Sequence, residues 1–270
     1  MYAMTDPQTL RTVSEQLATE AATFVQTRRA EVFGATPVQG AVEAKSTPTD
    51  PVTVVDKETE RLLRERLAEL RPGDHVLGEE EGGSAVGEPG VPVWVIDPID
   101  GTVNFVYGIE AYAVSVGVQI DGVSVAGAVA NVSTGEVYSA ALGHGATLTG
   151  AGTQTALRCN VIDDLSMALV GTGFSYQAQQ RARQAAVLAE LLAQVRDVRR
   201  IGSCALDLCM VAEGRLDAYF ENDVRVWDWA AGALIAAEAG AVVRLPSEDA
   251  GTALMAAAPG IAEALAARIG

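Results

Sequence analysis

The chain has 270 residues, 49% of them hydrophobic, and its 19 Lys and Arg against 35 Asp and Glu give a formal net charge of −16. This length suits one large domain or two packed halves. The acidity disfavours nucleic acids and anionic membranes as partners, because both carry negative charge. With three cysteines, Cys159, Cys204 and Cys209, and only two histidines, a disulfide framework, a zinc site or a Ser-His-Asp site is not expected.

The sequence shows no pattern typical of a targeting or membrane-spanning segment. Its first residues, Met-Tyr-Ala-Met-Thr-Asp-Pro, lack the basic region and apolar run of a signal peptide. No run of about 18 uncharged apolar residues predicts a transmembrane helix. We therefore expect a soluble, cytoplasmic protein.

The first hundred residues predict two helices, a long Gly- and Pro-containing loop and two short strands. Each helix has apolar residues at the spacing of one helix face, and the second helix is followed by Pro-Gly. The long loop is expected to be functional or mobile. The expected elements are helix 8–33, loop or short hairpin 34–51, helix 54–70, strand 76–77, loop 82–92 and strand 93–96.

The rest of the chain predicts first an antiparallel meander and then alternating strands and helices. Asp-Gly, Thr-Gly and Gly-His-Gly turns separate the meander strands, expected at 112–120, 123–131, 135–141 and 146–149. The alternating part is expected as strand 168–172, helix 179–195, strand 197–200, helix 203–213, strand 216–221, helix 228–239, strands 241–244 and 253–257, and helix 259–268. We therefore expect an α+β half, residues 1–150, and an α/β half, residues 151–270, in one compact unit.

The segment from Asp97 to Thr102 carries the clearest chemical pattern. A buried strand delivers Asp97, and Pro98 cannot continue the hydrogen-bond ladder, so the chain is expected to turn there and to bring Asp100 close to Asp97. Two neighbouring carboxylates repel one another unless a cation lies between them, and Mg²⁺ prefers oxygen ligands. Free N–H groups at Gly101 and Thr102 can bind phosphate. Asp-Gly is also common in ordinary turns.

Three further carboxylates stand at the expected ends of elements, where α/β folds place their sites. Glu79 follows a short strand, Asp56 follows the apolar run 52–55, and Asp228 opens a predicted helix. Each also has a simpler explanation, and Asp228 in particular could be an N-cap. Together with Asp97 and Asp100 they favour a shared metal site.

At this point the motifs become specific to one family. The sequence Asp-Pro-Ile-Asp-Gly-Thr-Val-Asn-Phe at 97–105, Gly-Glu-Glu at 78–80 and Trp-Asp-Trp-Ala-Ala-Gly at 227–232 resemble the inositol monophosphatase family, as does the run at 45–56. The order and spacing are most similar to the bacterial inositol-1-monophosphatase subgroup. The resemblance implies a layered αβαβα sandwich and Mg²⁺-dependent hydrolysis of a phosphate monoester.

The resemblance also implies how the metal ions are held. Glu79, Asp97 and the backbone carbonyl of Ile99 would hold a first Mg²⁺. Asp97, Asp100 and Asp228 would hold a second ion, and Glu79 would touch a third, weaker one. Catalysis would use Thr102 and Asp56, which help to deprotonate the attacking water, together with Glu79.

For the substrate, the resemblance implies a phosphate held by the backbone of Gly101 and Thr102. The residues expected around the alcohol are Asp100, Arg199, Gly202, Ser203, Cys204, Glu221 and Asp228, with Lys45 and Asp50 on a mobile loop. Glu221 could instead be a solvated strand end, Arg199 a surface ion pair and Lys45 an ordinary loop charge. Cys204 stands where the family often has Ala.

The activity implied is hydrolysis of myo-inositol monophosphate. Relatives act on fructose 1,6-bisphosphate, histidinol phosphate or adenosine 3′,5′-bisphosphate, so these substrates stay open. Some bacterial relatives are partners in transcription and ribosomal RNA processing, which leaves a role as an interaction protein open too. The resemblance further implies inhibition by Li⁺ and a homodimer.

Overall fold

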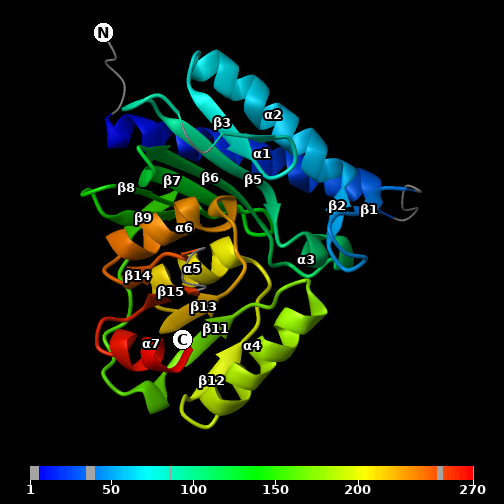
Figure 1. Cartoon of the computed structure of the whole chain (residues 1–270). Helices are drawn as coiled ribbons and strands as arrows, with labels where there is room; N and C mark the ends of the chain where they lie inside the picture. Colours follow the sequence, from blue (N-terminus) through cyan, green and yellow to red (C-terminus); the bar gives the residue numbers. More distant parts are fainter. Residues whose placement is uncertain (1–5, 35–39, 85–86, 248–251, 270) are drawn as a thin grey trace.

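Five layers of helices and sheets make up the computed structural model, which describes residues 6–34, 40–84, 87–247 and 252–269. Figure 1 shows helices α1 and α2 on the first sheet, α5 and α6 between the two sheets, and α4 and α7 beyond the second. The helices are α1 (Pro7–Val32), α2 (Val54–Leu70), α3 (Thr102–Tyr107), α4 (Ala178–Leu191), α5 (Cys204–Glu213), α6 (Val226–Glu238) and α7 (Ala262–Ile269). The expected αβαβα sandwich is confirmed.

The first sheet has eight strands in the order β10-β9-β8-β7-β6-β5-β3-β4. All neighbouring strands run antiparallel except β3 and β5, which are parallel. The strands are β3 (His75–Gly78), β4 (Gly82–Gly83), β5 (Val93–Asp100), β6 (Ala113–Ile120), β7 (Val123–Asn131), β8 (Val137–Ala141), β9 (Ala146–Gly150) and β10 (Thr153–Ala156). The predicted meander is therefore confirmed, and β10 carries this sheet past residue 150.

The second sheet has five strands in the order β12-β11-β13-β15-β14. Strand β11 runs parallel to both its neighbours, whereas β15 runs antiparallel to both of its own. The strands are β11 (Leu169–Thr172), β12 (Asp197–Arg199), β13 (Ala218–Glu221), β14 (Val242–Arg244) and β15 (Leu254–Ala257), and a 3₁₀ turn covers Leu165–Met167.

The described residues of the expected loop 34–51 include a short hairpin just before α2. Strand β1 (Val42–Ala44) pairs antiparallel with β2 (Pro51–Thr53). Residues 35–39 of the expected loop 34–51, and 85–86 of the expected loop 82–92, lie outside the described residues. Among the helices that are described, none is long and apolar enough to span a bilayer.

Strand β5 does not end at Pro98, contrary to the prediction from the sequence. It continues to Asp100, and its pairing with β6 shifts between Asp97, opposite Ser115, and Asp100, opposite Ala113. The shift places one extra residue on β5, which is a β-bulge. Side chains three apart on a regular strand point to opposite faces. The bulge therefore brings both carboxylates to the same side.

Helix α6 lies very close to the first sheet because two facing strand positions have no side chain. A Cβ on Gly117 would lie 2.8 Å from the Cβ of Ala230, and a Cβ on Gly127 would lie 2.9 Å from the Cα of Ala231. Any side chain at either glycine would push the helix away from the sheet. The start of α6, which carries Asp228, is therefore held at a fixed distance from the sheet that carries Asp97 and Asp100.

Candidate metal centre and substrate pocket

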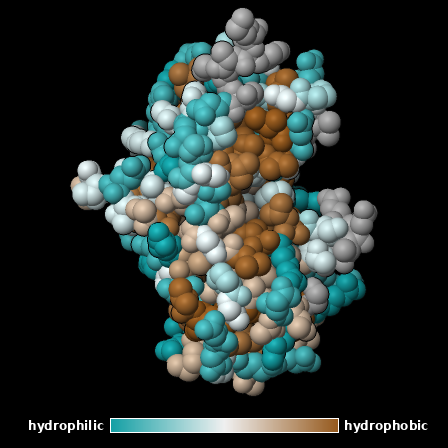
Figure 2. All heavy atoms as spheres, turned by 90° about the vertical axis from the view of Figure 1, so that its left-hand side faces the viewer, coloured by the Kyte–Doolittle hydropathy of each residue, from teal (hydrophilic) through white to brown (hydrophobic). Residues whose placement is uncertain are grey.

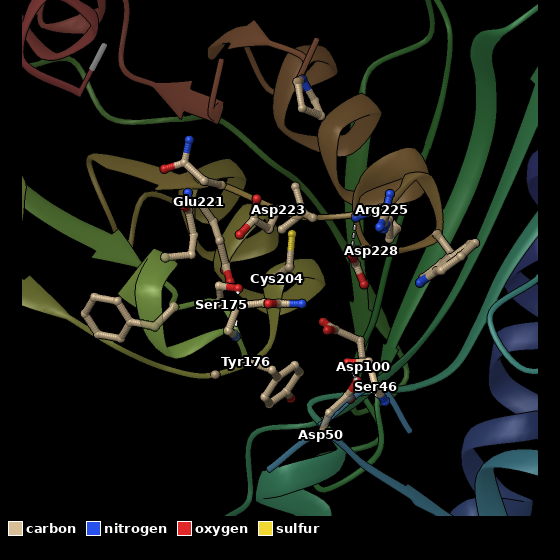
Figure 3. Close-up of a pocket in the computed structure, with 18 of the residues that line it drawn as sticks. Ser46, Asp50, Asp100, Ser175, Tyr176, Cys204, Glu221, Asp223, Arg225 and Asp228 are labelled. Carbon is tan, nitrogen blue, oxygen red and sulfur yellow. Dashed lines mark hydrogen bonds between the residues drawn. The ribbon is translucent and has the colours of Figure 1, made fainter. Parts of the chain in front are cut away.

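Three carboxylates from two distant segments converge at the end of β5. Oxygens of Asp97, Asp100 and Asp228 lie within 4.8 Å of one another. A small cavity of about 80 Å³ adjoins them, and its lining also includes Glu79, Ile99 and Thr102. Figure 3 shows the side chains of Asp100 and Asp228 pointing toward one another. The structure thus brings the five expected metal ligands to one cavity, with Glu79 outside the three-carboxylate cluster.

Each carboxylate of the cluster is oriented by its own segment. Asp97 accepts a hydrogen bond from the backbone N–H of Ile99 at 3.0 Å. Asp228 lies in the first turn of α6 and accepts the backbone N–H of Arg225 at 2.5 Å. Asp228 is therefore not the N-cap residue, which is Arg225. It is the third residue of the helix, its side chain accepts the N–H of that N-cap, and it also belongs to the cluster.

The electrostatics of the cluster call for a cation. Burial, reinforced by the neighbouring carboxylates, raises the pKa of Asp97 and of Asp228 well above the ordinary value. Burial also raises the pKa of Asp100 to about 6, although hydrogen bonds from Ser203 and Ala205 stabilise its charged form. Grouped, buried carboxylates are costly without a counter-charge. A donor set made of carboxylate and carbonyl oxygens fits a hard divalent cation such as Mg²⁺.

Asp56 and Thr102 form a buried pair beside the cavity. The hydroxyl of Thr102 lies 3.2 Å from Oδ1 of Asp56 and 3.0 Å from the carbonyl oxygen of Ile99. Asp56 is fully buried, and burial raises its pKa to about 7 despite hydrogen bonds from Thr53. It lies in the first turn of α2, with Thr53 in a capping box, rather than at a strand end as expected.

Lys45 pairs with Glu79, which lines the small cavity, and with the neighbouring Glu80. Its Nζ lies 2.7 Å from Oε1 of Glu79 and 2.5 Å from Oε1 of Glu80. Burial opposes the charge of Lys45, but the two glutamates outweigh burial and raise its pKa. Asp50 lines the same cavity and accepts hydrogen bonds from the N–H and hydroxyl of Ser46. Lys45 is thus an internal counter-ion of Glu79 and not an ordinary loop charge.

A second, larger pocket of about 1020 Å³ adjoins the carboxylate cluster. Its lining includes Gly202, Cys204 and Glu221, all expected around the alcohol, and Tyr176, which the sequence analysis missed. Glu221 ends β13 half-buried rather than exposed, the Tyr219 hydroxyl contacts it, and burial raises its pKa to about 7.

Gly101 joins the two pockets and needs to be glycine. Its φ is 94°, a left-handed conformation that other residues rarely adopt, and a Cβ would lie 2.9 Å from the carbonyl oxygen of Ala111. Ser203 does not line either pocket. It caps α5 and hydrogen-bonds Asp100 instead.

Comparisons with known proteins agree with this site. The family model described as "Inositol monophosphatase family" matches residues 6–269. The chain belongs to the inositol monophosphatase family. It is 66% identical over 274 residues to an inositol-1-monophosphatase of Mycobacterium leprae, covering 98% of this chain and 94% of that one. The inositol-1-monophosphatase SuhB of Mycobacterium tuberculosis is 62% identical over 273 residues, with the same coverage.

Solved structures show the same fold. The structure of Mycobacterium tuberculosis SuhB has a TM-score of 0.84 and 58% identity, covering 98% of this chain and 96% of that one. An inositol monophosphatase from Anabaena has a TM-score of 0.81 and 28% identity, covering 97% and 95%. The fold and the family are therefore established by sequence and by structure.

Besides Ser203, a second residue expected around the alcohol by resemblance to the inositol monophosphatase family, Arg199, lies outside both pockets. Arg199 ends β12, is exposed and pairs with Asp197 at 2.6 Å, so it does not line either pocket. The surface ion pair, left open in the sequence analysis, is what the structure shows. Arg200 lines the large pocket instead. Arg200 directly follows β12, and the sequence alone does not show which of the two adjacent arginines faces the pocket.

Proposed function

We propose that this chain hydrolyses myo-inositol monophosphate to myo-inositol and phosphate. The observation that carries the proposal is the cluster of Asp97, Asp100 and Asp228 within 4.8 Å, opening into a pocket lined by acidic and basic polar groups. The relatives with 62–66% identity are named inositol-1-monophosphatases. The structure of the inositol monophosphatase II of Staphylococcus aureus, 26% identical with a TM-score of 0.76, has been solved with inositol monophosphate bound.

The lining of the small cavity supports a proposal for the metal-holding residues. Asp97, Asp100 and Asp228, with Glu79 and the carbonyl of Ile99, would hold two to three Mg²⁺ ions. When bound, Mg²⁺ neutralises phosphoryl oxygens, lowers the pKa of water and stabilises the leaving alkoxide.

The chain's own groups supply the remaining steps. Thr102 Oγ1 would accept the proton of the attacking water and pass its own proton to Asp56, which lies 3.2 Å away. The raised pKa of Asp56 suits a group that takes up a proton near neutral pH. The backbone of Gly101 and Thr102 would position the phosphate, while Glu221 and Arg200, which line the large pocket, would face the alcohol.

A panel of four phosphate esters, each with and without Mg²⁺, tests this proposal. The esters are inositol 1-phosphate, fructose 1,6-bisphosphate, histidinol phosphate and adenosine 3′,5′-bisphosphate. We expect the highest kcat/KM for inositol 1-phosphate and no turnover without Mg²⁺. Much faster turnover of any of the other three esters would overturn the substrate assignment.

A second candidate function is binding to the transcription machinery. A Vibrio cholerae relative named Nus factor SuhB is 40% identical over 195 residues, covering 72% of this chain. A pull-down with tagged chain would test for RNA polymerase or an elongation factor. Asp97→Asn should keep such binding while losing phosphatase activity.

Inhibition by Li⁺, a homodimer and a cytoplasmic location belong to the same proposal. Figure 2 shows hydrophobic residues exposed along one face of the molecule, a feature that interfaces between subunits often share. Full activity in high Li⁺, or a purely monomeric species in sedimentation, would contradict the first two. Cell fractionation tests the third.

A further inference from the structure

Glu60 is a fully buried carboxylate on α2 that lies directly behind the turn between β3 and β4. Its Oε2 accepts the backbone N–H of Glu80 at 2.7 Å, and its Oε1 accepts the backbone N–H of Glu81 at 2.9 Å. These two N–H groups directly follow Glu79 in the chain. The carboxylate therefore fixes the backbone that carries Glu79.

Arg64, one helical turn later, completes this arrangement. Its Nε and Nη2 donate to Oε1 of Glu60 at 3.0 and 2.8 Å, and Nη2 also donates to the carbonyl oxygen of Gly82 at 2.5 Å. Two side chains of α2, Glu60 and Arg64, thus bind the N–H groups of Glu80 and Glu81 and the carbonyl of Gly82. A buried carboxylate is tolerated only when it is paired in this way.

Gly78 provides the space for the carboxylate. A Cβ at this position would lie 2.2 to 2.7 Å from the three carboxylate atoms of Glu60. Any side chain at residue 78 would displace Glu60 or the turn. The glycine before Glu79 is therefore explained by the group packed behind it.

We propose that Glu60 is a positioning residue for the metal centre. It holds the turn so that Glu79 faces the cavity that adjoins Asp97, while Glu60 itself lines neither pocket. The inference rests on the proposed function for its metal, and it adds a residue that the family motifs do not single out. Residues that orient metal ligands typically change metal affinity by about 10- to 100-fold when they are replaced.

Glu60→Gln is the direct test, because glutamine keeps the shape and places an amide NH₂ where Glu80 or Glu81 needs an acceptor. Glu58→Gln is the matched control, since Glu58 is on the same helix and also pairs with an arginine, Arg28, at 2.8 Å. We expect Mn²⁺ binding, measured by calorimetry on the metal-free chain, to weaken by about tenfold or more in Glu60→Gln and to stay unchanged in Glu58→Gln.

Activity and amide exchange give two further readouts. The Mg²⁺ concentration for half-maximal activity should rise by about tenfold, while kcat at saturating Mg²⁺ should stay within about threefold. Hydrogen exchange at the amides of Glu80 and Glu81 should accelerate. A purely structural role would instead lower the melting temperature and leave Mn²⁺ affinity unchanged, and that result would overturn the proposal.

Arg64→Met keeps the proposal falsifiable if Glu60→Gln does not fold. Arg64 is 24% exposed, so its loss is milder, and it should weaken Mn²⁺ binding in the same direction. Normal Mn²⁺ affinity in the folded variant would overturn the proposal. If the unaltered chain bound Mn²⁺ but hydrolysed no phosphate ester, the proposed function would fail, whereas the role of Glu60 would still be decided by binding.

Discussion

The Ser203 hydroxyl lies 2.5 Å from Oδ2 of Asp100, and the backbone N–H of Ala205 lies 2.7 Å from the same oxygen. The start of α5 therefore occupies one oxygen of Asp100 and leaves the other for the cluster. This contact links the second half of the chain to a carboxylate of the first.

Ser203→Ala should weaken Mg²⁺ binding by about tenfold, because Asp100 loses the group that orients it. Stability should fall by about 1 kcal/mol, since the same hydroxyl caps α5. Calorimetry and thermal unfolding measure the two effects. Ser166→Ala serves as the control because its hydroxyl donates to Asp164, which is exposed and far from the cluster in the sequence. Unchanged Mg²⁺ affinity in Ser203→Ala would show that the backbone N–H alone orients Asp100.

Asp97→Asn should lower kcat/KM by about a thousandfold or more, because the metal centre supplies several kcal/mol of transition-state stabilisation. The same change should raise the melting temperature of the metal-free chain, since it removes a buried acid whose charged form is disfavoured by burial and by the neighbouring carboxylates. Asp121→Asn, in an exposed turn, should change neither quantity. Normal turnover by Asp97→Asn would contradict the metal assignment.

The stability of the metal-free chain should fall as the pH rises from about 5 to about 8. Folding raises the pKa of Asp100 to about 6 and that of Asp56 to about 7. When a carboxyl group has a higher pKa in the folded than in the unfolded chain, its contribution to stability is fully present at pH values below the pKa of the unfolded chain. This contribution is lost as the pH rises through the pKa of the folded chain.

Added Mg²⁺ should reverse this trend, because it binds the deprotonated carboxylates. The increase in melting temperature on adding Mg²⁺ should therefore be larger at about pH 8 than at about pH 5. Differential scanning calorimetry at constant ionic strength measures both series. Equal increases at the two pH values would count against a carboxylate-based site.

Arg200→Met should raise KM for the phosphorylated alcohol by about tenfold with little change in kcat, because a hydrogen bond to a charged group contributes about 1.5–3 kcal/mol. Arg199→Met should leave KM unchanged, since Arg199 pairs with Asp197 at the surface. Steady-state kinetics on both variants decides between the adjacent arginines. The opposite pattern would restore the assignment made from the sequence.

The sequence predicted most elements because their patterns are local. The apolar run before Asp97, the Asp-Gly and Thr-Gly turns, and the alternation after residue 150 each reflect burial or turn geometry within a few residues. The carboxylates at 97, 100 and 228 could be grouped from motif resemblance, and the structure places them together.

The features that were missed depend on contacts between distant segments. The β-bulge between Asp97 and Asp100 is visible only from the pairing with β6. Glu60 occupies an ordinary charged position of a helix in the sequence, and its role appears only once Gly78 and the turn are packed against it. The choice of Arg200 over Arg199 required knowing that the residue after β12, and not the last residue of the strand, lines the pocket.

The close packing of α6 against Gly117 and Gly127 determines which substitutions the chain can tolerate. Neither glycine offers a functional group, yet a single added methyl at either would shift the helix whose first turn carries Asp228. A survey of random variants should therefore find Gly117 and Gly127 as intolerant as the carboxylates themselves. Such a survey would identify residues that hold the site in place from the sheet, as well as the residues that face the ligand.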